Sequence, residues 1–543
     1  MAQIRVANLT FGYEGGYDSI FENVSFSVDT DWKLGFIGRN GKGKTTFLNL
    51  LLGKYEYQGV ISTSTVFDYF PYQITEVQMA ECCGDFLEEL RPGCELWRVI
   101  CELEQLHLEA DVLYRPFGTL SHGERTKVML AVLFSGENRF LLIDEPTNHL
   151  DQASREIVKS YLSRKKGFIL VSHDRDLLDA CIDHVLVLNR HSIEVQSGNF
   201  SSWWENKERM DHFHEMENEK HRKEIQKLQK AADRTRNWAD QNERTKIGFD
   251  PAKEHDRCIS TRAYIGAKTK KMQSRVRQLE TRISDEIEQK EGLLQDIERP
   301  VDLKLMPLSH HKEVLIRAKD YSLAYPSADV KNAAAGSGQG LHEVLRDFHF
   351  ELRQGERVFL QGENGCGKSS FIKAVLAHTK EYGGENRLDS GSGGQTVVSG
   401  NGSPAAMLEQ GALTTASGLI ISYVNQDTSG LRGDLKEFCR KRNLEESLLK
   451  AILRQLDMDR VQFDKGMETY SEGQKKKVLI AASLLTQAHL YIWDEPLNYI
   501  DVFSRMQIED LILHYQPSML LVEHDVRFRE KIATRVVEMK KGI

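Results

Sequence analysis

An internal repeat constrains the fold more than any other feature of this 543-residue sequence. Four short strings occur twice, in the same order along the chain. They are GRNGKGKT and GENGCGKS, LSHGERTK and YSEGQKKK, LLIDEP and YIWDEP, and LVSHD and LVEHD. The spacing agrees as well, because Ser121 lies 23 residues before Asp144 and Ser471 lies 23 residues before Asp494. Repetition at this scale indicates two homologous domains in one chain.

The first string of each copy matches the phosphate-loop pattern GxxxxGK followed by Ser or Thr. An apolar, strand-like run precedes each loop and helix-like sequence follows it, which predicts an α/β fold of the P-loop type. The glycines let backbone N–H groups surround phosphate oxygens, and the helix N-terminus attracts the anion. The loop residues predicted to bind ATP are Gly38, Asn40, Gly41, Gly43, Lys44, Thr45 and Thr46, and Gly362, Asn364, Gly365, Gly367, Lys368, Ser369 and Ser370.

An Asp-Glu pair ends an apolar strand downstream of each loop, and a His ends a later apolar strand. An Asp there, with the loop hydroxyl, can hold Mg²⁺, and the following Glu can orient and polarise the attacking water. A solvated turn is the alternative for such a pair, but the upstream phosphate loop disfavours it. The predicted metal ligands are Thr45, Asp144, Ser369 and Asp494, and the predicted catalytic residues are Glu145, Glu495, His173 and His524.

The repeat predicts one domain at 1–204 and another at 312–543, separated by a linker at 205–298 and a connector at 299–311. The second copy is longer between its loop lysine and its YSEGQKKK string. A Gly/Ser-rich, aperiodic run at 383–418 accounts for the difference, and we expect it to be a flexible surface insertion.

The linker has the composition of long exposed helices. From Ser201 to Trp238 there is no Pro or Gly, which predicts a helix of about 38 residues, roughly 57 Å long. Apolar residues spaced by three, four and seven between Met272 and Ile297 predict a second helix. We expect an antiparallel helical hairpin with its tip at about 240–262.

Charge is concentrated in this linker. Residues 220–277 contain 17 Lys and Arg against 7 Asp and Glu, although the whole chain has a formal net charge of −8. A basic segment in an acidic chain predicts contact with RNA or DNA, and a solvated coiled coil that binds nothing is the alternative. The candidate RNA-binding residues are Arg234, Arg236, Arg244, Lys246, Phe249, Lys253, Arg257, Ile259, Arg262, Lys268, Lys270 and Lys271.

Composition argues against several other classes of protein. The eight Cys form no CxxC pair or metal-ligand spacing, as expected of reduced thiols. No uncharged apolar run approaches the roughly 18 residues that span a membrane. The N-terminal residues lack the pattern of a signal peptide. We therefore expect a cytoplasmic protein with no membrane partner.

The repeated motifs together resemble those of ABC ATPases. Paired ATPase domains joined by a long charged linker are similar to the ABC-F class of translation factors, and most similar to its Lsa-type antibiotic-resistance members. The strings that carry the likeness are WKLGFIGRNGKGKTT, YRPFGTLSHGERTKV, LIDEPTNHLD, GFILVSHDR, GNFS, SYVNQD and LYIWDEPLNY.

The resemblance implies that the two domains pack head to tail within a monomer and share two ATP sites. Lys44 would face Ser471 and Gly473 across one site. Lys368 would face Ser121 and Gly123 across the other. The residues that the resemblance adds are Tyr13 and Tyr325 for adenine stacking, Gln73 and Gln426 beside Mg²⁺, and Asp151 and Asp501 at the interface. Among these, Gln73 departs from the pattern, because it stands one residue later than Gln426 does.

The resemblance also implies a function. It implies an ATPase using ATP and Mg²⁺ whose linker enters the exit-tRNA site of the bacterial ribosome, near large-subunit rRNA and tRNA in or near the P and E sites. There it would displace antibiotics and confer resistance to lincosamides, pleuromutilins and streptogramin A. A housekeeping ABC-F factor acting on stalled ribosomes is the nearest alternative. A transporter's ATPase subunit is more distant, because it leaves the basic linker unexplained.

One position departs from the resemblance. LSHGERTK has His122 at its third place, where Gly is usual, and Glu472 occupies that place in the second copy. Both copies keep the Ser and the second Gly, so we expect both strings to work in ATP sites. We expect the side chain at the third place to point away from ATP.

Overall fold

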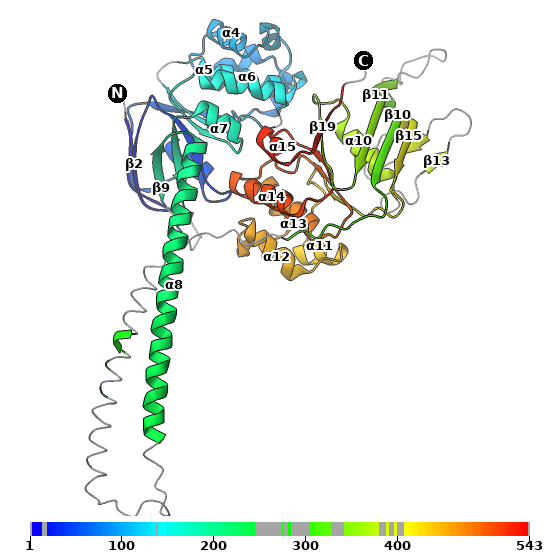
Figure 1. The fold of residues 1–543 in the computed structure, drawn as a ribbon. Coiled ribbons are helices and arrows are strands. Elements are labelled where there is room, and N and C mark those ends of the chain that lie inside the picture. Colours follow the sequence, from blue (N-terminus) through cyan, green and yellow to red (C-terminus); the bar gives the residue numbers. More distant parts are fainter. Residues whose placement is uncertain are drawn as a thin grey trace, which may run out of the picture. The chain divides into compact units, whose positions relative to one another are not determined.

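The computed structural model describes residues 3–13, 19–136, 139–148, 150–189, 192–244, 274, 278, 281–283, 304–326, 341–379, 387–389, 396–398 and 407–540 (Figure 1). The chain divides into two compact units, Met1–Ser201 with Pro300–Ile543, and Ser202–Arg299. Both copies of the repeat lie in the first unit.

The first copy folds as two sheets with helices. A three-stranded antiparallel sheet has the order β2-β1-β4, and a six-stranded sheet has the order β5-β6-β7-β3-β8-β9, parallel except for β9. Its strands are β1 Gln3–Phe11, β2 Phe21–Asp29, β3 Lys33–Ile37, β4 Gln58–Ser62, β5 Val66–Phe70, β6 Arg139–Asp144, β7 Phe168–Val171, β8 His184–Leu188 and β9 Ile193–Ser197. Its helices are α1 Lys44–Leu51, α2 Glu76–Ala80, α3 Cys83–Leu90, α4 Leu96–Gln105, α5 His122–Phe134, α6 Gln152–Ser163 and α7 Arg175–Cys181, with 3₁₀ turns η1 Ala110–Tyr114 and η2 Phe117–Thr119.

The second copy repeats this plan, which confirms the duplicated α/β fold. Its parallel sheet, β16-β17-β18-β12-β19, has the order of β5-β6-β7-β3-β8, and its antiparallel sheet is β11-β10-β15-β14-β13. Its strands are β10 Val314–Pro326, β11 Leu341–Arg353, β12 Arg357–Gln361, β13 Arg387–Asp389, β14 Thr396–Val398, β15 Met407–Thr415, β16 Ile421–Val424, β17 Leu490–Asp494, β18 Met519–Val522 and β19 Arg535–Glu538. Its helices are α10 Lys368–Ala377, α11 Leu435–Lys441, α12 Glu446–Gln455, α13 Glu472–Leu485, α14 Val502–Tyr515 and α15 Val526–Ile532, with 3₁₀ turns η4 Arg460–Asp464 and η5 Met467–Thr469.

The two kinds of sheet follow from two kinds of sequence. The parallel strands β7 and β18 are apolar throughout and every residue in them is buried. Parallel strands covered on both faces read this way. In β1, buried and more exposed residues largely alternate, as expected of a strand with one solvated face. The apolar core of the first copy joins β1 and β2 to the parallel sheet through Phe47 and Leu48 of α1.

The run 383–418 contains ordered strands, so the prediction that it is one flexible insertion is wrong for its second part. β15 pairs antiparallel with β10 along most of its length. Leu413 of β15 and the following Ala416 are buried in the core of the second copy. β15 is the counterpart of β4, which pairs with β1 in the first copy. Pairing and core contacts make it a strand despite its loop-like composition.

A repeated bulge explains a glycine in each of these paired strands. Asp320 of β10 has φ 47° and Asn8 of β1 has φ 52°, and the strand register shifts beside both residues. Gly411 and Gly59 lie opposite, with φ 94° and 110°. A Cβ on Gly411 would overlap the carbonyl oxygen of Asp320, so the close approach of the two backbones requires glycine.

The linker begins with one long helix, α8 Phe200–Arg244, of 45 residues. The predicted helix is confirmed, but it runs six residues beyond Trp238, because no Gly or Pro occurs before Gly248. Of the predicted second helix, positions 274, 278 and 281–283 are described, and all are helical. The predicted tip at 240–262 lies outside the described residues from 245 on. Among the described helices, none is long and apolar enough to cross a membrane.

Candidate nucleotide sites

Each phosphate loop connects a buried parallel strand, β3 or β12, to a helix, α1 or α10. The last loop glycine caps the helix in the left-handed region, with φ 109° at Gly43 and 97° at Gly367. A Cβ on Gly43 would lie 2.6 Å from Ile20, and one on Gly367 would lie 2.7 Å from Val344. Both positions therefore require glycine, and both loops end at a helix N-terminus, where an anion is favoured.

The loop lysines lie inside these cradles. Lys44 Nζ donates to the carbonyl oxygen of Gly38 at 2.6 Å and to Asn40 Oδ1 at 3.1 Å. Lys368 Nζ donates to the carbonyl oxygen of Gly362 at 2.6 Å. Burial lowers the pKa of Lys44 below its usual value, although neighbouring carboxylates oppose this. Phosphate oxygens could replace these carbonyls as acceptors, so the cradles fit a nucleotide.

Oxygen donors suited to Mg²⁺ lie beside each loop. Thr45 Oγ1 donates to Asp144 Oδ2 at 3.2 Å, and Ser369 interacts with Asp494 in the second copy. Asp494 Oδ1 is buried with no hydrogen-bond partner, and burial raises the pKa of Asp494 to about 6. A hard divalent cation would satisfy that oxygen and offset the cost of burying its charge. Tyr69, which the sequence did not suggest, donates to Asp144 Oδ2 at 3.1 Å.

The predicted catalytic pairs are both assembled. Glu145 Oε1 lies 3.4 Å from His173 Nε2, and Glu495 Oε1 lies 3.6 Å from His524 Nε2. Both glutamates adopt the left-handed region, with φ 50° and 47°. The backbone N–H of each donates to the last residue of the neighbouring strand, at 2.9 Å. The same strained turn therefore aims a carboxylate beside the phosphate loop in both copies.

The environments of the two glutamates differ. Glu145 Oε1 is buried with no hydrogen-bond partner, and burial together with the charge of Asp144 raises the pKa of Glu145 to about 8. Glu495 Oε2 accepts from Gln426 Nε2 at 2.8 Å and from Asn498 Nδ2 at 2.7 Å. Burial alone would raise the pKa of Glu495, but its hydrogen bond and charge interaction with His524 lower it below its usual value.

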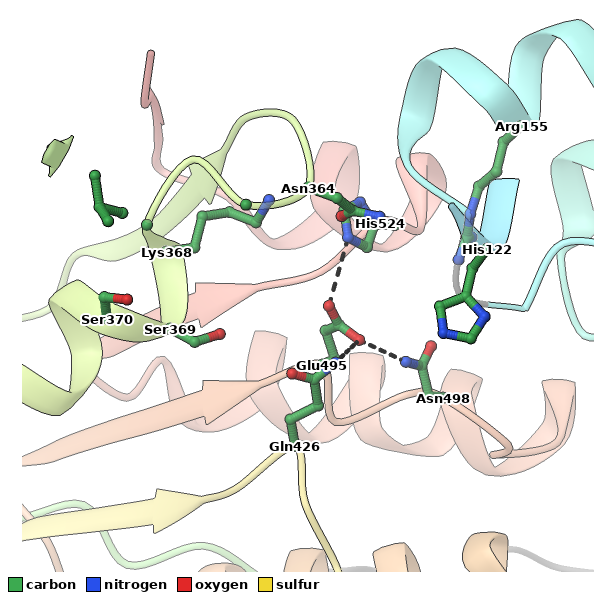
Figure 2. Close-up of a pocket in the computed structure, with 13 residues that line it drawn as sticks. His122, Arg155, Asn364, Lys368, Ser369, Ser370, Gln426, Glu495, Asn498 and His524 are labelled. Atoms are coloured by element: carbon green, nitrogen blue, oxygen red, sulfur yellow. Dashed lines mark hydrogen bonds and ion pairs between the residues drawn. The ribbon is translucent and has the colours of Figure 1, made fainter. Parts of the chain in front are cut away.

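Around Glu495 the two copies together form a pocket of about 470 Å³ (Figure 2). Two of its lining residues come from the first copy and the others from the second. They are His122 and Arg155, and Val344, Asn364, Gly365, Gly367, Lys368, Ser369, Ser370, Gln426, Glu495, Asn498 and His524. His122 of the LSHGERTK string therefore lines the same pocket as the Lys368 loop, but Ser121 and Gly123, the predicted partners of Lys368, are not among the lining residues. Their contact with ATP stays a prediction. His122 lines this pocket, which counts against the expectation that its side chain points away from ATP.

Contacts across the domains also occur at the first phosphate loop. Asn40 Nδ2 donates to the carbonyl oxygen of Tyr499 at 2.7 Å. A Cβ on Gly473 would lie 3.6 Å from the same Asn40 nitrogen. Ser471 caps α13 through a capping box with Gln474, as Ser121 caps α5 with Glu124. The loop that holds Lys44 therefore faces the YSEGQKKK string, as the resemblance implied.

The predicted adenine-stacking residues lie at the loop helices. Tyr13 hydroxyl shares a hydrogen bond of 2.9 Å with Thr46 Oγ1, and Tyr325 hydroxyl donates to Ser370 Oγ at 3.0 Å. Tyr13 is 46% exposed, so its ring is available to a ligand. The two tyrosines occupy equivalent places, each held to the helix that follows the phosphate loop.

Strand register shows that the two predicted glutamines, Gln73 and Gln426, do not occupy equivalent places. Tyr69 in β5 and Tyr423 in β16 pair with equivalent residues of β6 and β17. Counting from these pairs, Tyr72 rather than Gln73 occupies the place of Gln426, and Gln73 is exposed. The role of Gln73 beside Mg²⁺ stays a prediction.

The two predicted interface aspartates cap helices. Asp151 accepts from the backbone N–H of Ser154 at 2.9 Å, and Asp501 accepts from that of Ser504 at 2.9 Å. Asp501 is fully buried and also accepts from Lys477 Nζ at 2.9 Å. This lysine ties the interface loop of the second copy to the helix that begins at its YSEGQKKK string.

A buried charge network that the sequence did not predict joins the two copies. Arg175 of α7 donates two hydrogen bonds to Glu509 of α14, one of them at 3.1 Å. Arg175 also lies 3.9 Å from Asp525, which accepts from Arg505 at 3.0 Å. All four side chains are at most 8% exposed. We call Arg175, Glu509, Arg505 and Asp525 the interdomain charge network.

Few of the candidate RNA-binding residues are described. Arg234 is exposed on α8, and Arg236 and Arg244 lie on the same helix. The other candidates, from Lys246 to Lys271, lie outside the described residues.

The chain is similar in sequence to known proteins. The model of the ABC transporter family matches residues 21–148 and 345–498, once in each copy. The ribosome protection protein VmlR of Bacillus subtilis is 24% identical over 540 residues, covering 98% of this chain and 86% of VmlR. ABC transporter F family member 2 of Arabidopsis thaliana is 22% identical, covering 99% of this chain and 76% of that protein.

A solved structure shares the fold. It is the archaeal ribosome recycling factor aABCE1 in complex with ribosomal stalk protein aP1, with a TM-score of 0.55, 17% identity, and coverage of 98% of this chain and 87% of that one. At this identity the likeness concerns the fold alone. Because the family match covers more than half of the sequence and falls on both phosphate loops, the chain belongs to the ABC transporter family and carries its ATP-hydrolysing domain twice.

Proposed function

We propose that this chain is a ribosome-associated ATPase of the ABC-F type, in which ATP joins the two copies and the linker acts on the ribosome. The observation that carries the proposal is the pocket around Glu495, which takes residues from both copies. A ligand bound there contacts both halves at once, so it favours their closed arrangement. A nucleotide can shift such an equilibrium only by binding one arrangement better than the other.

The roles of the residues follow from their places. The two phosphate loops, with Lys44 and Lys368, hold the phosphates of ATP. Mg²⁺, held by the hydroxyl and carboxylate oxygens beside each loop, would neutralise charge on those phosphates. Glu145 and Glu495 orient the attacking water and accept its proton, and the neighbouring His of each pair holds the carboxylate. Loss of the γ-phosphate then removes a link between the copies and lets them separate.

The proposed partner rests on the relatives and on charge. VmlR, which matches almost the whole chain, is named as a ribosome protection protein. Residues 220–277 of the linker, with 17 Lys and Arg against 7 Asp and Glu, are strongly basic in an acidic chain, as expected for contact with rRNA and tRNA. We infer that the linker enters the exit-tRNA site and displaces antibiotics from the peptidyl-transferase region, in the bacterial cytoplasm. A housekeeping role on stalled ribosomes would use the same ATP chemistry.

Trapping tests the ribosome proposal. With Glu145→Gln and Glu495→Gln together, ATP should bind without turnover, and the protein should sediment with bacterial ribosomes. Adding Lys44→Ala and Lys368→Ala to the same protein should abolish this, because ATP no longer binds. If the doubly substituted Gln protein with ATP stays in the supernatant, the proposal is wrong.

Growth separates the two roles. Expression in a susceptible bacterium should raise the inhibitory concentrations of lincosamides, pleuromutilins and streptogramin A. The Lys44→Ala, Lys368→Ala protein, made at the same level, should not. Ribosome binding without protection from any of these drugs would favour the housekeeping role.

A further inference from the structure

His122 opens the helix that meets the second phosphate loop. Ser121, one residue earlier, accepts a hydrogen bond from the backbone N–H of Glu124 at 3.2 Å. Glu124 in return accepts from the backbone N–H of Ser121 at 2.7 Å. This capping box fixes the backbone on both sides of His122. The side chain is exposed and lines the pocket around Glu495.

The imidazole lies on the far wall of that pocket from the phosphate loop. Figure 2 shows His122 pointing toward Asn498 and Glu495, with Lys368 and Ser369 on the opposite side. Lys368 and Ser369 lie where a phosphate chain is held, so the wall with His122 faces the end of that chain. An imidazole carries an N–H donor in either protonation state, which a phosphate oxygen can accept.

The equivalent residue of the second copy is engaged differently. Glu472 accepts a hydrogen bond from Thr428 Oγ1, and it forms an ion pair with Lys475 Nζ at 3.2 Å. Both partners belong to its own domain. These contacts lower the pKa of Glu472, although burial opposes them. A carboxylate would also repel a phosphate. The two strings thus share a backbone frame but present opposite chemistry at their third place.

We propose that His122 donates a hydrogen bond to the γ-phosphate of ATP in the second site, and so makes that site prefer ATP to ADP. The inference rests on the proposed function, because it requires ATP at the Lys368 loop. The second site then has a contact from the other copy, through His122. The first site lacks the equivalent contact, because Glu472 stands at that place.

Nucleotide affinity in a single-site protein tests this role. Lys44→Ala disables the first site, so binding of a non-hydrolysable ATP analogue and of ADP reports the second. His122→Ala should weaken the ATP analogue about tenfold, the worth of a hydrogen bond to a charged group, and leave ADP affinity within about twofold. His122→Gln, which keeps an N–H donor at similar reach, should restore most of the loss.

A matched control uses the other site. In a protein with Lys368→Ala, Glu472→Ala should not weaken the ATP analogue relative to ADP, because Glu472 is held within its own domain and its carboxylate would repel a phosphate. If His122→Ala weakens ATP and ADP equally, or weakens neither, the inference is overturned and the proposed function stands. If the Lys44→Ala protein binds no ATP analogue, the proposed function fails and the inference fails with it.

Discussion

Replacing Arg175 by Met removes one half of a buried ion pair that joins the two ATPase copies. The guanidinium of Arg175 is 3% exposed and the carboxylate of Glu509 is 1% exposed, and the two make a double hydrogen bond. The substitution leaves Glu509 charged and buried, and among the described residues Lys531, with its Nζ at 3.1 Å, is the cation that remains paired with it. It therefore tests how the copies hold together before any nucleotide binds.

The expected magnitude follows from burial. Breaking a buried pair by removing one partner costs about 3–5 kcal/mol, because the other charge remains out of water. Lys531 is half exposed and offsets part of this, so we expect a loss of about 3 kcal/mol for Arg175→Met. Replacing both residues, with Arg175→Met and Glu509→Leu, removes both buried charges. The double change should then cost at least about 2 kcal/mol less than the sum of the single changes.

Urea unfolding of the four proteins measures this coupling. Proteolysis at the domain boundary measures the urea midpoint at which contact between the copies is lost, because the unfolding of two domains need not be two-state. Lys531→Met is the control, since a half-exposed partner of the same carboxylate should matter by less than about 1 kcal/mol. If the effects of Arg175→Met and Glu509→Leu simply add within about 0.5 kcal/mol, the pair does not hold the copies together and the reasoning is refuted.

Three further outcomes follow from the described contacts. Gly411→Ala should lower the free energy of unfolding by about 1–3 kcal/mol, because its Cβ would overlap the carbonyl of Asp320. Gly418→Ala is the control, since Gly418 also has a positive φ but has nothing within 4 Å of its Cβ position, and it should cost less. Thermal denaturation of the two proteins compares these costs. Lys477→Met leaves a fully buried carboxylate without its ammonium partner, so it should cost about 3 kcal/mol in the same assay. Burial alone would raise the pKa of Asp525, but the guanidinium groups of the interdomain charge network outweigh this and hold the pKa below its usual value. The contribution of Asp525 to stability is therefore present above the unfolded pKa of about 3.9 and is lost as pH falls through the lower folded pKa. Urea midpoints between pH 6 and 3 should show this loss, and a flat profile would contradict it.

Local spacing predicted which side chains would lie together at the candidate nucleotide sites. A phosphate loop, an Asp-Glu pair and a His each follow an apolar strand, and parallel strands bring such strand ends to one edge. The structure accordingly places Glu145 beside His173 and Glu495 beside His524. Nothing in that argument required knowledge of distant contacts.

Composition misled where pairing decides structure. The Gly/Ser-rich run suggested a flexible insertion. Instead β15 forms, because it pairs antiparallel with β10 and buries Leu413 in the core of the second copy. The signal was present in the repeat itself, since QGVIST around Gly59 resembles QGALTT around Gly411. Comparing the copies glycine by glycine, rather than motif by motif, would have found it.

The interdomain charge network and the direction of His122 could not be predicted from the sequence, for a different reason. Arg175 and Glu509 are 334 residues apart, and no periodicity links them. The direction of His122 also depends on how α5 meets the second loop. These features need the relative placement of two whole domains, which local patterns do not encode.

The repeat, finally, separates what the two nucleotide sites share from what distinguishes them. Backbone geometry is common to both, since Glu145 and Glu495 have nearly equal φ and the same strand-end hydrogen bond. Side chains differ, because Gln426 and Asn498 both donate to Glu495, whereas Glu145 Oε1 has no hydrogen-bond partner and lies 3.4 Å from His173. A carboxylate held by two amides as well as a His is more firmly fixed before a water arrives than one held beside a His alone. Any inequality in turnover between the sites must therefore come from a few side chains on an otherwise symmetric frame.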